Sequence, residues 1–207
     1  MEDYFIDEMI SEFCGAVMGD GNIWSNGRKY EITLTGNIIT DREYFDYIYF
    51  FVHSRIKKPY YRVRSRGLRL TIYSKKFYQF ITNKIGIPPR TLKCKFGIPP
   101  RISVTKKLLK AFIRGLFDTD GSVFTSHKKG IESYPTLEIT NSNQTLLIQV
   151  YKTLIEMGFR INYRHAGNGS YKISIYGMKM LAKWNNDIGS SNPHKRRRIN
   201  TILESFR

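Results

Sequence analysis

The sequence predicts an α+β fold of two pseudo-symmetric αββαββα repeats, each a four-stranded antiparallel sheet packed under helices. Two observations predict it. The same order of helical and alternating apolar patterns occurs twice along the 207 residues, and a helix of core-type residues ends on Asp-Gly once in each half, at 20–21 and 120–121. A chain of this length can bury a sizeable core, as one large domain or as two small ones.

The first element of each repeat is a helix of small and apolar residues, FCGAVMGDG at 13–21 and IRGLFDTDG at 113–121. Small residues recur every four positions in both, at Gly15 and Gly19 and at Ala111, Gly115 and Thr119. Such spacing lets two helix backbones approach closely. We therefore expect these helices to pack against each other about a pseudo-twofold axis, which brings Asp20 and Asp120 side by side.

The remaining elements follow in the same order in each half. Hairpins at 22–37 and 122–143 precede helices at 43–56 and 145–158, which have apolar residues at helical spacing. Second hairpins at 60–76 and 160–179 turn at Arg-Gly and Gly-Asn-Gly, and helices at 75–86 and 178–189 close the units. The predicted repeats therefore span 1–98 and 108–207, with a proline-containing linker at 99–107.

Composition narrows the function. Lys and Arg number 34 against 17 Asp and Glu, a formal charge of +17, which favours a polyanionic partner, with nucleic acid ahead of an anionic membrane surface or a merely solvated basic surface. Two cysteines without a CxxC and four scattered histidines exclude a disulfide framework, a zinc finger and a histidine-metal nuclease. With neither a signal peptide nor an apolar run of membrane-spanning length, we expect an intracellular, soluble protein, in the cytoplasm or an organelle matrix.

Strand alternation sorts the charged residues onto one face of each predicted sheet. That face is expected to contact double-stranded DNA, because Arg pairs with guanine, Asn with adenine and many polar side chains with phosphate. The predicted DNA-binding residues are Lys29, Glu31, Thr33, Thr35, Arg62, Arg64, Arg66, Arg69, Thr71, Tyr73, Thr136, Glu138, Thr140, Arg160, Asn162, Arg164, Lys172, Ser174 and Tyr176.

The two terminal aspartates are an unfavourable way to end two adjacent helices. A helix C-terminus carries partial negative charge, and Asp20 and Asp120 each add a full one. Divalent cations resolve the repulsion, because Mg²⁺ prefers carboxylate oxygens and bridges readily to phosphates. An ordinary helix stop explains one Asp-Gly as well. Two copies at matching points of a repeat favour the metal site.

The two motif helices resemble the signature helices of the LAGLIDADG homing endonucleases, in the single-chain form with two motifs. The resemblance covers nearly the whole chain, because the hairpins and flanking helices follow the same order. It implies a monomer that makes a double-strand break in a long, nearly asymmetric DNA site. Proteins of this family are usually encoded within introns or inteins. It also implies Mg²⁺ held by Asp20 and Asp120, with the carbonyls of Gly19 and Thr119, Mn²⁺ as a substitute, and Ca²⁺ binding without efficient cleavage.

Further site residues follow from the same resemblance. A polar residue at the end of the second strand corresponds to Asn141 or Ser142 in one repeat and to Gly36 or Asn37 in the other, and Asn141 is the better candidate. An active-site lysine after the last helix corresponds to Lys93 or Lys95 and to Lys195, of which we favour Lys93 and Lys195. The first motif departs from the second by having Met18 where Asp118 stands. The alternative function is a non-catalytic nucleic-acid binder on this fold, such as an intron RNA maturase or a DNA-binding regulator.

Overall fold

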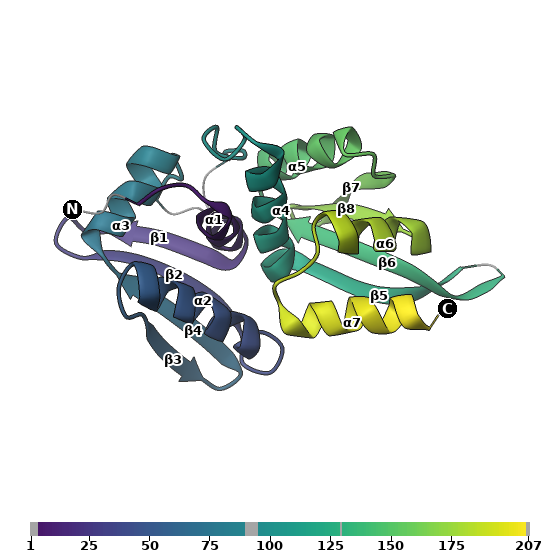
Figure 1. Ribbon diagram of the computed structural model, residues 1–207, viewed down its shortest axis with the longest axis horizontal. Coiled ribbons are helices and arrows are strands. Elements are labelled where there is room, and N and C mark those ends of the chain that lie inside the picture. The colour runs from purple at the N-terminus through teal and green to yellow at the C-terminus, as the bar shows by residue number, and fades with distance from the viewer. Residues whose placement is uncertain (1–3, 90–94, 129, 206–207) are drawn as a thin grey trace.

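Two helix-covered sheets lie side by side in the computed structural model, which describes residues 4–89, 95–128 and 130–205 (Figure 1). Each sheet has four antiparallel strands, in the orders β1-β2-β4-β3 and β5-β6-β8-β7. The identical strand orders confirm the predicted α+β fold and its repeat. Among the described residues, no helix combines the length and the apolar character required to cross a bilayer.

The elements of the two repeats correspond in order up to α6, the counterpart of α3. The first repeat contains α1 (Glu8–Asp20), β1 (Gly21–Ser25), β2 (Tyr30–Asn37), α2 (Arg42–Arg55), β3 (Tyr60–Arg64), β4 (Gly67–Tyr73) and α3 (Lys75–Gln79), which continues as the π-helix η1 (Phe80–Ile85). The second contains α4 (Lys106–Asp120), β5 (Gly121–Lys128), β6 (Ile131–Asn141), α5 (Gln144–Glu156), β7 (Ile161–Gly167), β8 (Ser170–Tyr176), α6 (Met178–Asp187) and α7 (Pro193–Glu204).

Two boundaries differ from those that the sequence suggests. Helix α4 begins at Lys106, within the predicted linker at 99–107, because the Thr105 hydroxyl accepts a hydrogen bond from the Leu108 amide and caps the helix. Helix α7 is an additional element after α6. It begins at Pro193, where the Asn192 side chain accepts hydrogen bonds from the next turn.

Strand register places the polar and apolar side chains as the alternation predicts. On the helix side, Ile32 pairs with Ile72 and Leu34 with Leu70, and the second sheet repeats this with Leu137, Ile139, Ile173 and Ile175. All eight of these side chains are buried. The opposite face of each sheet is not covered by these helices, and we call it the open face.

Helices α1 and α4 pack against each other at very short range. A Cβ built on Gly15 would lie 2.0 Å from the Phe112 carbonyl oxygen, and one on Gly115 would lie 1.9 Å from the Glu12 carbonyl oxygen. Any side chain at either position would force the backbones apart. This reciprocal contact is the reason for glycine at both positions, and it joins the two repeats along their central helices.

One ion pair crosses this interface inside the protein. The Glu12 side chain, 1% exposed, accepts a hydrogen bond from Arg114 Nε at 2.7 Å, and Arg114 Nη2 lies 2.7 Å from the same carboxylate oxygen. Arg114 also donates to the Ile188 carbonyl oxygen. A buried charge is tolerated when it is paired and hydrogen-bonded, so this pair favours one orientation of the repeats.

Candidate metal and DNA site

The two motif acids lie at adjoining helix ends. Helix α1 ends at Asp20 and helix α4 ends at Asp120. Gly19 makes this possible, because a Cβ on Gly19 would lie 2.1 Å from Thr119 Oγ1 and 3.2 Å from Asp120 Cγ. The close helix packing therefore continues to the last turn and brings both acids to one place.

The glycine after each acid has a role other than that of an ordinary helix cap. Gly21 and Gly121 have φ of −101° and −91°, which are extended rather than left-handed. A Cβ on Gly21 would lie 2.4 Å from the Val17 carbonyl oxygen, and one on Gly121 would lie 2.5 Å from the Phe117 carbonyl oxygen. Each glycine lets the chain turn from the helix end straight into a strand, which leaves the aspartate at the junction.

Both carboxyl groups have raised pKa values. Burial, followed by the nearby Asp20 carboxylate, raises the pKa of Asp120 to about 7, against opposing effects of Asn141 and Lys195. Desolvation and then the Asp41 carboxylate raise the pKa of Asp20, and Lys195 opposes this too. Like charges and desolvation both favour the neutral acid, so the site has an excess of negative charge that a cation would relieve.

Asn141 lies where the sequence expectation puts it, beside one of the acids. Its Nδ2 donates to Asp120 Oδ2 and lies 3.5 Å from the Met18 carbonyl oxygen. Its Oδ1 accepts from the Asn143 amide at 2.7 Å, which orients the amide group. In the first repeat, Asn37 instead closes a turn, with its Oδ1 accepting from the Ile39 amide.

Lys195 reaches the end of α4 from helix α7. Its Nζ donates to the carbonyl oxygens of Phe117, Asp118 and Thr119, at 2.7, 2.9 and 3.2 Å. Burial lowers the pKa of Lys195, and the surrounding carboxylates act in the opposite direction. Lys93 lies outside the described residues, and Lys95 is exposed.

Two further acids at this site were not among the expected residues. The buried Asp118 carboxylate accepts hydrogen bonds from the amides of Ser191 and Asn192 and from the Ser190 hydroxyl, while burial raises its pKa to about 7. Asn192 Nδ2 lies 3.4 Å from both Asp41 Oδ1 and the Asp118 carbonyl oxygen. These contacts hold the loop before α7, and thereby Lys195, against α4. The sequence did contain a signal for Asp118, because the second motif has this acid where the first motif has Met18. No sequence pattern pointed to Asp41.

The 19 residues predicted to contact DNA differ in how far they are exposed. The arginines of the open faces and their turns are exposed, at Arg62, Arg64, Arg66, Arg69, Arg160 and Arg164. Five central side chains have little exposed surface, namely Thr33 (5%), Thr71 (6%), Thr136 (3%), Glu138 (9%) and Ser174 (0%). Glu138 bonds to Lys172 at 2.7 Å and Ser174 at 3.0 Å. The long exposed side chains are therefore better placed to reach a partner.

The register places further residues on the open faces. Asn22 pairs with Thr33, Trp24 with Glu31, Tyr60 with Thr71, Ser122 with Glu138 and Phe124 with Thr136, so each shares a face with a predicted DNA contact. Paired residues of an antiparallel ladder point to the same side of the sheet. The same alternation rule, applied to β1, β3 and β5, would have found them.

The Asp20 and Asp120 carboxylates suit a magnesium ion whose other ligands come from water and from a substrate. Within the described residues, no group of three or more His, Cys, Asp or Glu side chains could hold a metal ion. Magnesium proteins often supply one or two carboxylates and leave the other positions to water and phosphate oxygens. Asp20 and Asp120 meet that requirement, and the Thr119 carbonyl already accepts from Lys195.

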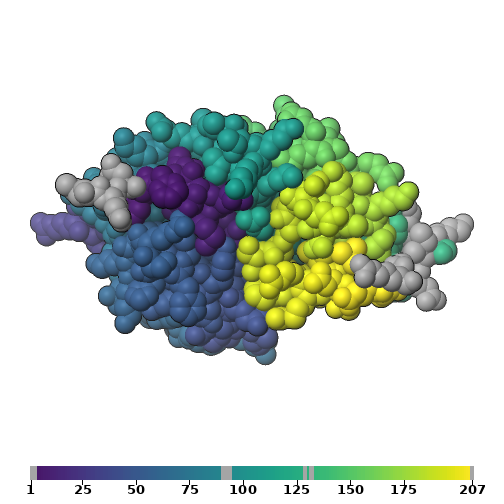
Figure 2. Space-filling model, in the orientation of Figure 1, coloured from purple at the N-terminus to yellow at the C-terminus, as the bar shows by residue number. Residues whose placement is uncertain are grey.

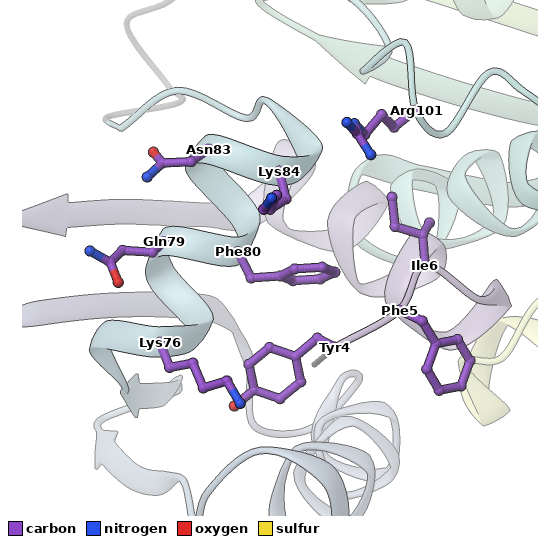
Figure 3. Close-up of a pocket in the computed structure, with 9 residues that line it drawn as sticks. All are labelled: Tyr4, Phe5, Ile6, Lys76, Gln79, Phe80, Asn83, Lys84 and Arg101. Atoms are coloured by element: carbon purple, nitrogen blue, oxygen red, sulfur yellow. The ribbon is translucent and has the colours of Figure 1, made fainter. Parts of the chain in front are cut away.

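A cavity near the N-terminus lies away from these acids. It measures about 720 Å³ and is bordered by the N-terminal segment at Tyr4–Ile6 and by side chains of α3 and η1, among them Lys76, Phe80 and Lys84 (Figure 3). The Tyr4 ring packs against Phe80 with centroids 5.4 Å apart. Neither motif acid lines this cavity, so it is separate from the candidate metal site.

Comparisons with known proteins agree with this architecture. A family model described as a LAGLIDADG-like domain matches residues 107–189. The uncharacterised protein MJ0398 of Methanocaldococcus jannaschii is 24% identical over 212 residues, covering 95% of this chain and 72% of that protein.

Solved structures match over most of the chain. The homing endonuclease I-DmoI in complex with DNA and Ca has a TM-score of 0.67 at 19% identity, covering 94% of this chain and 97% of that one. Full-length DUF199/WhiA from Thermatoga maritima has a TM-score of 0.60 at 18% identity, covering 99% of this chain and 63% of that one. Together, the family model and the shared fold confirm the resemblance of this chain to the LAGLIDADG family in its single-chain form with two motifs.

Proposed function

We propose that this protein is a site-specific DNA endonuclease that makes a double-strand break in a long, nearly asymmetric site. One observation carries the proposal. Two close-packed helices from the two repeats end on adjoining aspartates, Asp20 and Asp120, at the junction between the sheets. Without a cation this placement is costly, because the neighbouring Asp20 carboxylate disfavours ionisation of the desolvated Asp120.

A divalent cation, Mg²⁺ or Mn²⁺, would be held by Asp20 and Asp120. It supplies a Lewis acid for hydrolysis of a phosphodiester bond. Asn141 supports the site by orienting the Asp120 carboxylate through its hydrogen bond. Lys195 places an ammonium group beside both acids, where it would stabilise negative charge that develops on a reacting phosphate.

The open faces supply the DNA contacts in this proposal. The net charge of +17 favours duplex DNA through its phosphates. The exposed arginines Arg62, Arg64 and Arg69 lie together on β3 and β4, where guanidinium groups can pair with phosphates or with guanine edges. Because both repeats lie in one chain, a single monomer presents two different faces, and such a reader recognises an asymmetric site. Of the neighbouring structures, several are complexes of I-DmoI with its target DNA and a divalent metal.

The test is cleavage of a randomised duplex DNA library in Mg²⁺ by the wild type and by Asp20→Asn and Asp120→Asn. Asp187→Asn is the matched control, because Asp187 lies on α6 and pairs with Lys183 away from the site. We expect double-strand cleavage by the wild type and the control, and none by either site variant. Calorimetric titration with Ca²⁺ gives a second readout, in which the site variants lose binding and the control does not.

Each contrary result excludes a specific part of the proposal. Tight RNA binding without cleavage of any library by the wild type would replace it with a non-catalytic binder of the maturase kind. Cleavage retained by both Asp20→Asn and Asp120→Asn would leave the nuclease but remove these two residues from its site.

A further inference from the structure

Helix α7 carries a basic run, His-Lys-Arg-Arg-Arg at 194–198, of which the proposed site uses only Lys195. The helix begins beside the end of α4 and packs against β5, the edge strand of the second sheet (Figure 1). It also contacts α2 of the first repeat, and it lies at the surface in the space-filling view, coloured yellow (Figure 2). The basic run is therefore accessible and close to the metal site.

Two cavities follow α7 outward from the metal site. The first, of about 260 Å³, is bordered by Thr119, Ser122 and Lys195 among others. The second, of about 440 Å³, is bordered by Thr125, Arg197 and Thr201 among others. His194 and Arg198 line both, so the two cavities adjoin along α7. We call them together the α7 groove.

The chemistry of the α7 groove is that of a phosphate-binding surface. Guanidinium, imidazole and ammonium groups come from α7, and hydroxyl groups come from Thr40, Ser122, Thr125 and Thr201. Asp41 is the one acid among its described lining residues, and it accepts a hydrogen bond from the Asn37 amide at 2.7 Å. Arg197 pairs with Glu43 of α2, which leaves Arg198 as the arginine that faces both cavities. Hydroxyl and guanidinium donors together are typical contacts of phosphate oxygens.

We propose that the α7 groove binds the phosphodiester backbone of the DNA strand that leaves the cleavage site. The inference rests on the proposed function and adds to it a second surface, which meets the open face of the second sheet at Ser122. Thr119 and Gly121, the chain neighbours of Asp120, border the groove, so a strand held at the metal site lies next to its inner end. Helix α7 has 12 residues and is about 18 Å long, which is long enough to contact several phosphates of one strand.

The chain offers a matched pair of variants for the test. Arg198→Gln removes a guanidinium that lines both cavities, whereas Arg196→Gln removes one that is two residues earlier in the same helix and lines neither. Both side chains are exposed, so neither change should affect folding, and thermal melting checks this. Thr125→Asp adds a negative charge from the β5 side and tests the groove independently of α7.

The measurement is binding of a fluorescent random-sequence DNA duplex in Ca²⁺ over a series of KCl concentrations. Losing one phosphate contact lowers the slope of log K against log salt by about 0.9. We expect that loss, with several-fold weaker binding, for Arg198→Gln. Weaker binding is also expected for Thr125→Asp, and wild-type behaviour for Arg196→Gln.

The outcomes separate this inference from the proposed function. If the wild type does not bind duplex DNA, the proposed function and the inference both fail. If the wild type binds but Arg198→Gln and Thr125→Asp match Arg196→Gln, only the α7 groove is excluded. A parallel titration with single-stranded RNA identifies the occupant, because variants that weaken RNA binding alone would overturn the assignment to DNA.

Discussion

Gly115 lies so close to Glu12 of the facing helix that a Cβ at position 115 would be 1.9 Å from the Glu12 carbonyl oxygen. Gly15 has the same relation to Phe112, at 2.0 Å. These two contacts set the separation of α1 and α4, and the separation of the helices sets that of Asp20 and Asp120. The stability of the protein and the geometry of its candidate metal site therefore depend on the same pair of glycines.

Gly115→Ala is expected to destabilise the protein by about 1–3 kcal/mol or more, because the added methyl group meets backbone rather than a flexible side chain. The helix propensity of alanine offsets about 1 kcal/mol of this. Urea unfolding measures the difference. Gly67→Ala is the control, since its Cβ would meet nothing nearer than 3.3 Å. Equal unfolding free energies for the two variants would contradict the packing argument.

Arg114→Met is expected to cost about 3–5 kcal/mol in unfolding free energy, because it leaves the Glu12 carboxylate buried without its partner. Adding Glu12→Gln removes the charge and should restore most of the loss. Chemical denaturation of the two single variants and the double variant gives the coupling energy. A double variant no more stable than Arg114→Met would show that the ion pair is not the source of the effect.

Asp120→Asn is expected to stabilise the metal-free protein at alkaline pH. The folded-state pKa of Asp120 is about 7, above the unfolded value of about 3.9, so the folded state binds more protons between these values. Stability then falls as pH rises from about 4 to 7, by up to about 4 kcal/mol. The asparagine variant lacks this loss.

Thermal melting with a chelator, at pH 5 and pH 8 (about one to two units either side of the folded pKa), checks this prediction. The melting temperature of Asp120→Asn should exceed that of the wild type at pH 8, and the difference should be much smaller at pH 5. Asp187→Asn is the control, because Lys183 lowers the pKa of Asp187. Replacing the Asp187 carboxylate should therefore bring no gain in stability at high pH. A gain for Asp120→Asn that is the same at both pH values would exclude the ionised carboxylate as its cause.

Lys195→Gln is expected to lower the unfolding free energy by about 1–3 kcal/mol, because three carbonyl oxygens at the end of α4 lose a charged donor. Cleavage should fall as well, since the ammonium beside the acids is lost. Urea unfolding measures the first effect. Lys183→Gln removes an (i, i+4) surface pair of α6 and should change stability by less than about 0.5 kcal/mol. A similar small change for Lys195→Gln would contradict the capping role.

The local pattern of the sequence was sufficient for the elements and their faces. Alternation predicted that Ile32 and Leu34 point to the helices and that Thr33 and Thr35 do not, because successive side chains of a strand point to opposite sides. The exposure of each open-face residue was not predictable in this way. Thr33 and Ser174 lie on the open faces and are nevertheless 5% and 0% exposed, because the residues that flank them depend on the register of the neighbouring strands.

The residues of the candidate site also fall into a group that was predictable from the sequence and a group that was not. By itself, the sequence determined the repeat, the two Asp-Gly helix ends and the small residues that bring them together, because these depend on spacing within one helix. Only the tertiary structure decided that Asp118 and Asn192 hold the start of α7, that Lys195 reaches α4, and that Arg198 faces a groove. Those contacts join residues more than 70 positions apart. No local periodicity encodes such distant contacts, which depend on how the completed repeats pack.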